Sequence, residues 1–127
     1  MSAWLPTAQH IILLHEKITA RTGGASGIRD MGLIESALAR ASAAFGGAEA
    51  YPTVLGKAAA AGCGLTQNHG FVDGNKRVGI AAMLLILRRN DVKLCYTQEE
   101  LIALGLGTAQ EMNVAQVIHW LEAHLAR

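Results

Sequence analysis

A nine-residue segment in the middle of the chain carries more reactive side chains than a connecting loop needs. It reads His69-Gly70-Phe71-Val72-Asp73-Gly74-Asn75-Lys76-Arg77, with apolar stretches on both sides. His69 is the side chain in it that exchanges a proton near neutral pH. Asp73 offers hard oxygen ligands of the kind that magnesium prefers. Because catalytic groups often lie on loops that rigid elements position, this segment is the candidate functional site.

The end of the segment predicts a phosphate-binding site. Gly74 and Asn75 precede a long apolar stretch that is expected to be a helix, so the first backbone N–H groups of that helix would be unpaired at the positive end of its dipole. Lys76 and Arg77 add two cations, which normally destabilise a helix N-terminus and therefore indicate a function. A base, a metal ligand and a phosphate site favour phosphoryl or nucleotidyl transfer. A plain structural interpretation also remains open, in which His69 and Asp73 form a helix-capping hydrogen bond and Lys76 and Arg77 are a solvated helix end.

The elements that must position this loop are predicted to be helices, which makes the fold class all-α. Aromatic residues make up only 5% of the chain, and β-branched runs are scarce. Six helices are expected: Pro6 to about Arg21, one after the N-cap Asp30, Val54 to about Gln67, Asn75 to Asn90, and two opened by capping boxes at Thr97 and Asn113. Residues 45–52 are expected to form a small hairpin or flap, and Tyr51-Pro52 either belongs to a docking flap or is a plain turn.

The packing of these helices can be predicted from their apolar residues. The stretch Val78 to Leu87 is apolar nearly all round, so the helix that contains it is expected to be the central buried one. Small residues from Ala58 to Gly64 should let another helix approach closely. Trp120 is expected in the core, and Arg29-Asp30 could reach the site or merely cap a helix. The remaining expectations are buried free thiols at Cys63 and Cys95, a buried stripe that includes Leu125, and surface positions for His10, His15, His119 and His124.

Composition excludes several classes of protein. The chain has 127 residues, 51% of them hydrophobic and 17% charged, which excludes a disordered protein and fits one domain over residues 1–127. Its net charge is +1, so nucleic acid is not expected as the main partner. The longest apolar run is about half of what a bilayer-spanning helix needs. We therefore expect a cytoplasmic protein that has neither a membrane segment nor a signal peptide.

The loop resembles the signature of the Fic/Doc (Fido) superfamily, His-x-Phe-x-Asp/Glu-Gly-Asn-x-Arg. The resemblance is closest to the Doc branch, the death-on-curing toxins, because Lys76 stands where adenylylating Fic enzymes usually carry glycine. The segment Gly27 to Arg40, the chain length and the helix order are also similar to that branch. Gly70 departs from the proline that is common after the histidine, and Val78 departs from a frequent threonine.

The resemblance implies a compact helical Fido domain around a buried central helix and the activity of a toxin kinase. Such toxins transfer the γ-phosphate of ATP to a threonine of elongation factor Tu, which stops translation. Carried over by position, His69 would be the general base and Asp73 the Mg²⁺ ligand. The nucleotide phosphates would be bound by Gly74, Asn75, Lys76 and Arg77, of which the last two would also be catalytic.

The resemblance also implies a partner. Self-inhibited Fic proteins carry a glutamate followed by glycine or asparagine, and no such pair occurs in the printed sequence. Inhibition is therefore expected from a separate Phd-like antitoxin whose disordered tail folds on binding. Two alternatives remain: AMP transfer to a hydroxyl side chain, and an inactive module that only binds an antitoxin. Lys76 favours phosphate transfer over AMP transfer, because a long cation should crowd the usual phosphate path.

Overall fold

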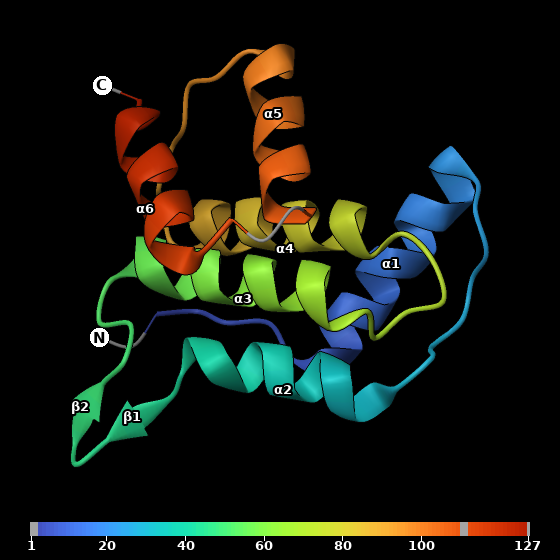
Figure 1. Cartoon of the computed structure of the whole chain (residues 1–127), viewed down its shortest axis with the longest axis horizontal. Helices are drawn as coiled ribbons and strands as arrows, with labels where there is room; N and C mark the ends of the chain where they lie inside the picture. The colour runs from blue at the N-terminus through green and yellow to red at the C-terminus, as the bar shows by residue number, and fades with distance from the viewer. Residues whose placement is uncertain (1–2, 110–111, 127) are drawn as a thin grey trace.

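Six α-helices dominate the structure, a computed structural model that describes residues 3–109 and 112–126 (Figure 1). They are α1 (Ala8–Thr22), α2 (Met31–Ala41), α3 (Val54–Asn68), α4 (Asn75–Arg89), α5 (Gln98–Ala109) and α6 (Val114–Ala123). Two short strands, β1 (Ala44–Phe45) and β2 (Ala48–Glu49), form an antiparallel hairpin between α2 and α3. The predicted all-α fold and the hairpin are confirmed. Within the described ranges, no helix combines the length and the apolar character needed to cross a membrane.

Side-chain caps decide where the helices begin. The Thr7 hydroxyl accepts the N–H of His10, and His10 Nδ1 accepts the N–H of Thr7 at 2.9 Å. Because this capping box satisfies two N–H groups at once, α1 begins after Thr7 and not at Pro6 as predicted. The side chains expected to cap later helices do so; they are Asp30, Thr97 and Asn113.

Helix α3 lies at the centre of the molecule, between α2 and α4, and also packs against α6 (Figure 1). Every residue from Gly56 to Thr66 is buried, whereas α4 leaves Leu84 and Leu85 on its outer face only half-buried. The prediction that the most buried helix starts at Asn75 is therefore wrong. Small residues fill the middle position between two helices, and the larger apolar residues of α4 line a surface that this chain leaves open.

Glycines set how closely α3 approaches its two neighbours. A Cβ built on Gly64 would lie 2.9 Å from Ala37 Cβ in α2. A Cβ on Gly79 of α4 would overlap Thr66 Oγ1 and lie 2.8 Å from the Gly62 carbonyl oxygen. The predicted close approach along this part of α3 is confirmed. It brings the end of α3 and the start of α4 together at one end of the molecule.

The β1–β2 hairpin lies at the other end of α3. Lys57, buried near the start of α3, donates a hydrogen bond to Glu49 Oε1 at 2.9 Å and ties the hairpin to the helix. The 15 residues of α3 separate this end from His69 by about 22 Å at the usual rise per residue. Tyr51-Pro52 therefore lies far from the candidate loop.

His124 ties the start of α5 to the end of α6. Its Nε2 lies 2.6 Å from Glu100 Oε2, its Nδ1 lies 2.6 Å from the Trp120 carbonyl oxygen, and its ring stacks on the Trp120 indole. The hydrogen bond to that carbonyl, followed by the one to Glu100, raises the pKa of His124. The Thr97 N–H, followed by His124, lowers the pKa of Glu100. Trp120 thus packs as predicted, whereas His124 is half-buried rather than at the surface.

Two further predictions about burial are wrong. Cys95 is exposed, while Cys63 is buried as expected and burial raises the pKa of its thiol to about 11. Leu125 is 43% exposed because it lies beyond the end of α6, where the backbone pairs with Leu94 instead of continuing the helix. His10 and His119 are exposed as predicted.

Gly79→Ala should destabilise the fold. The added methyl would overlap the Thr66 hydroxyl and the α3 backbone, so we expect a loss of about 1–3 kcal/mol in the free energy of unfolding, measured by urea titration. Gly105→Ala in α5 is the matched control, because its Cβ would meet the Lys76 stem at an ordinary 3.6 Å. Equal stabilities of the two variants would contradict this account of the α3–α4 contact.

Candidate active site

The candidate loop joins the end of α3 to the start of α4, and all the predicted site residues lie on it or in the first turn of α4 (Figure 1). His69 follows α3 directly and adopts a left-handed backbone, with φ 53° and ψ 49°. A non-glycine residue held in this region costs about 1 kcal/mol or more, and such strain is concentrated at functional sites. The Arg29 side chain donates from Nε to the His69 carbonyl oxygen at 2.8 Å, and the His69 side chain is exposed.

Backbone hydrogen bonds fasten the loop to the segment before α2. Val72 N donates to the Gly27 carbonyl at 3.1 Å, and the Gly70 carbonyl accepts from Arg29 N at 2.8 Å and from Asp30 N at 2.9 Å. This pairing resembles a fragment of antiparallel sheet with Ile28 opposite Phe71. Arg29 therefore serves the site by holding its backbone, while Asp30 caps α2.

Gly70 makes the attachment possible. A Cβ at this position would lie 2.5 Å from Ile34 Cγ1 and 3.2 Å from Ile34 N, so a larger residue would push the loop away from α2. The glycine that departs from the family signature thus does not loosen His69, because its carbonyl is held by two N–H groups.

Phe71 and Asn75 form the buried underside of the loop. Phe71 is 2% exposed. The Asn75 side chain brackets its backbone: Oδ1 accepts from Phe71 N at 3.0 Å and Nδ2 donates to the Phe71 carbonyl at 3.1 Å. Asn75 is predicted to bind phosphate, but its side chain is already hydrogen-bonded within the loop. Only its backbone N–H is therefore available to a ligand.

Asp73 is exposed, and two backbone N–H groups orient its carboxylate. Oδ1 accepts from Gly74 N at 2.8 Å and Oδ2 accepts from Ala25 N at 3.3 Å. Gly24 makes room for this contact, because a Cβ added at this position would lie only 2.7 Å from Asp73 Oδ2. A carboxylate with one hydrogen bond on each oxygen keeps lone pairs for a further ligand.

The first turn of α4 is open to a ligand. Gly74 precedes it in a left-handed conformation, and no side chain among the described residues caps it. Its backbone N–H groups and the helix dipole therefore favour an anion. Lys76 and Arg77 are exposed on this turn; Arg77 Nη1 donates to Thr22 Oγ1 at 3.2 Å, and the Lys76 stem lies beside Gly105 of α5.

His15 of α1 belongs to this site, although it was predicted at the surface. It is 2% exposed, its Nε2 lies 2.7 Å from the Asp73 carbonyl oxygen, and its ring stacks on Phe71. One signal could have indicated its burial: four residues after Ile11 and three before Ile18, it lies on the apolar stripe of its helix. The loop that it contacts is 58 residues away, so the sequence alone does not predict the contact.

The fold and this loop define a known class of proteins. A model of the Fic/DOC family matches residues 5–87, and the chain belongs to that family, as its motif predicted. Over 72 residues it is 46% identical to Toxin Doc of Mycolicibacterium smegmatis, covering 57% of this chain and 55% of the toxin. Over 110 residues it is 34% identical to Protein kinase doc of Escherichia phage P1, covering 86% of each chain. The aligned part thus spans about half the length of the first relative and most of the second.

Gly70→Ala should detach the loop from α2. The new methyl would meet Ile34 Cγ1, and we expect a loss of about 1–3 kcal/mol in the free energy of unfolding. A double-mutant cycle by urea titration checks the cause: in an Ile34→Ala background, where Cγ1 is absent, the same change should cost less. Equal costs in both backgrounds would show that the close approach is not what requires glycine.

Proposed function

We propose that this protein is the toxin of a toxin–antitoxin pair and a cytoplasmic protein kinase that transfers the γ-phosphate of ATP to a threonine of elongation factor Tu, which inhibits translation. The observation that supports this best is the start of α4, which no side chain of the described residues caps and which follows directly on the loop that carries His69 and Asp73. The relative from phage P1 that aligns over 86% of both chains carries the name Protein kinase doc.

In the proposed reaction, His69 removes the proton of the threonine hydroxyl. The hydroxyl oxygen then bonds to the γ-phosphorus, the bond to the bridging oxygen breaks, and ADP leaves with that electron pair. Lys76, Arg77 and the N–H groups of the α4 first turn bind the phosphates. Gly74 contributes its left-handed turn and Asn75 its backbone N–H, since its side chain holds Phe71.

Asp73 fits the role of a magnesium ligand. Within the described part of the chain, no group of three or more His, Cys, Asp or Glu side chains could hold a metal ion. Mg²⁺ bound with nucleotides is commonly held by one or two carboxylates together with substrate phosphates, and the exposed Asp73 carboxylate keeps lone pairs for such a bond. Once bound, the ion would neutralise charge on the phosphates.

Lys76 favours phosphate transfer over the AMP transfer of adenylylating family members, which usually have glycine here. Its side chain and that of Arg77 line a hollow of about 360 Å³ between α1, α4 and α5. A long cation at this position would occupy space on the phosphate path that glycine leaves open, and would favour a different pose of the nucleotide.

His69→Ala should abolish transfer. Loss of a general base costs on the order of 10²–10⁴-fold in rate, and the exposed side chain can be removed without unfolding the chain. The assay follows label from γ- and α-labelled ATP into elongation factor Tu, with exposed His119→Ala as the matched control. Label from the γ position supports the kinase. Label from the α position would instead show AMP transfer, and no label from the wild type would support an inactive binding module.

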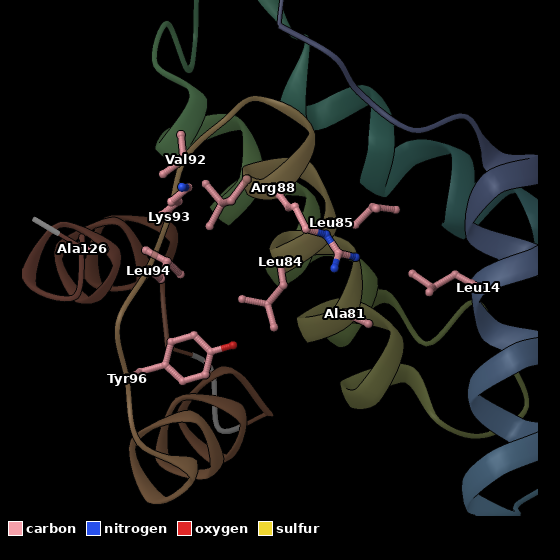
Figure 2. A pocket seen from close by; sticks show the side chains of 11 residues that line it. Leu14, Ala81, Leu84, Leu85, Arg88, Val92, Lys93, Leu94, Tyr96 and Ala126 are labelled. Atoms are coloured by element: carbon pink, nitrogen blue, oxygen red, sulfur yellow. The ribbon is translucent and has the colours of Figure 1, made fainter.

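An apolar groove on α4 offers a docking site for the proposed antitoxin. It has a volume of about 600 Å³ and lies between α1, the outer face of α4 and the segment from Val92 to Tyr96. Figure 2 shows Leu84 and Tyr96 directed into the space between helix and segment. Arg88 and Lys93 are the charged side chains in its lining. An apolar floor with two cations fits an amphipathic helix that carries acidic residues.

The groove leads toward the proposed phosphate site. Ala81 and Leu84 line both the groove and the smaller hollow that contains Lys76 and Arg77. A helical segment long enough to fill both would reach these cations and compete with the nucleotide for them. A separate Phd-like chain bound in this groove could therefore inhibit the enzyme by blocking the proposed phosphate site.

Leu85→Glu should weaken neutralisation by the antitoxin. A carboxylate on the apolar floor would be desolvated and would repel acidic residues of the partner, so we expect at least about a tenfold loss of affinity. The test co-expresses each variant with a Phd-like antitoxin and measures growth and co-purification. Leu13→Glu, an exposed leucine of α1 that does not line the groove, is the control. Equal neutralisation of both variants would contradict docking in this groove.

A further inference from the structure

We propose that His15 is a positioning residue of the active site: from α1, it orients the peptide between Asp73 and Gly74 and thereby the proposed magnesium ligand and the start of α4. The inference rests on the proposed function for its catalytic consequence. The geometry that carries it is the 2.7 Å contact between His15 Nε2 and the Asp73 carbonyl oxygen, together with the stacking of the ring on Phe71.

The hydrogen bond has a defined direction. A carbonyl oxygen only accepts, so Nε2 of His15 must carry the proton and donate it. The ring is 2% exposed and lies nearly parallel to the Phe71 ring, with 3.9 Å between centroids and an angle of 9°. His15 thus supplies both an aromatic surface and a donor, a combination that leucine or phenylalanine at this buried position would not provide.

The bond acts on a rigid unit. The Asp73 carbonyl and the Gly74 N–H belong to one planar peptide group, so fixing the first fixes the direction of the second. That N–H donates to Asp73 Oδ1 at 2.8 Å. His15 therefore acts on the Asp73 carboxylate through one peptide plane.

The same peptide leads into the anion site. Gly74 adopts a left-handed backbone with φ 75° directly before the first turn of α4. A Cβ on Gly74 would lie 3.4 Å from His15 Nε2, which shows how closely the imidazole approaches the start of the helix. A tilt of this peptide would move the N–H groups of the first turn relative to His69. Misplacements of about 1 Å at such sites cost on the order of a hundredfold in rate.

Two variants separate positioning from packing. His15→Phe keeps a ring to stack on Phe71 but has no donor, whereas His15→Gln keeps an N–H donor at a similar reach but has no ring. If His15 positions the loop, His15→Phe should be the more stable variant and His15→Gln the more active one. We expect kcat for phosphate transfer from ATP to fall about ten- to a hundredfold in His15→Phe, with partial rescue in His15→Gln. If His15 only fills space, activity should follow stability, with His15→Phe the better variant in both.

A second measurement keeps this test independent of the proposed reaction. Amide NMR spectra of the wild type and both variants report the Gly74 and Asn75 N–H groups directly, without any substrate. Larger shifts and faster hydrogen exchange at Gly74 in His15→Phe than in His15→Gln would support the positioning role. If the wild type transferred no phosphate while these amides still responded, the proposed kinase function would fail and the positioning role would stand. Unchanged amides in His15→Phe, or His15→Phe as the more active variant, would overturn the inference.

Discussion

The site depends on the attachment of one irregular loop to the backbone of a distant segment. Residues 69–73 have no helix or full strand to hold them, yet their main chain pairs with residues 27–30 and their start is fixed by Arg29. This pairing holds His69 in a left-handed conformation. The close α3–α4 contact then brings the two ends of the loop together. Without both constraints, the reactive side chains would sit on a flexible connection and their relative positions would not be defined.

Burial separates the residues that hold the site from the residues proposed to do chemistry. Gly70, Phe71, Asn75 and His15 are buried. The Gly70 carbonyl is held by the segment before α2, the Asn75 amide brackets the Phe71 backbone, and His15 stacks on Phe71 and contacts the Asp73 carbonyl. The exposed residues are His69, Asp73, Lys76 and Arg77. The first set therefore determines where the second set lies, and within the second set Asp73 and Arg77 also bond to the residues 22–25 at the end of α1 and just after it. The loop thus combines buried residues that fix its backbone with exposed residues that are proposed to react.

Much of this arrangement could be predicted from sequence because it is local. Caps, the hairpin and the reactive loop follow from residues within a few positions of one another. The errors concern long-range packing. His15 looks like a surface histidine until a loop 58 residues away covers it. The apolar character of α4 suggested the central helix, but small residues give α3 that position and the leucines of α4 line a groove. The inward turn of the Asn75 amide likewise depends on how the loop folds back on Phe71.

The open face of α4 has a consequence for how control of the proposed activity would be timed. The groove and the residues proposed to bind phosphate share α4, with Ala81 and Leu84 common to both hollows. An inhibitor seated there would exclude the nucleotide by simple occupancy, without any relay of conformational change through the fold. The rate at which activity recovers would then equal the rate at which the inhibitor dissociates or is degraded. The lifetime of that complex would therefore set how long the activity stays off.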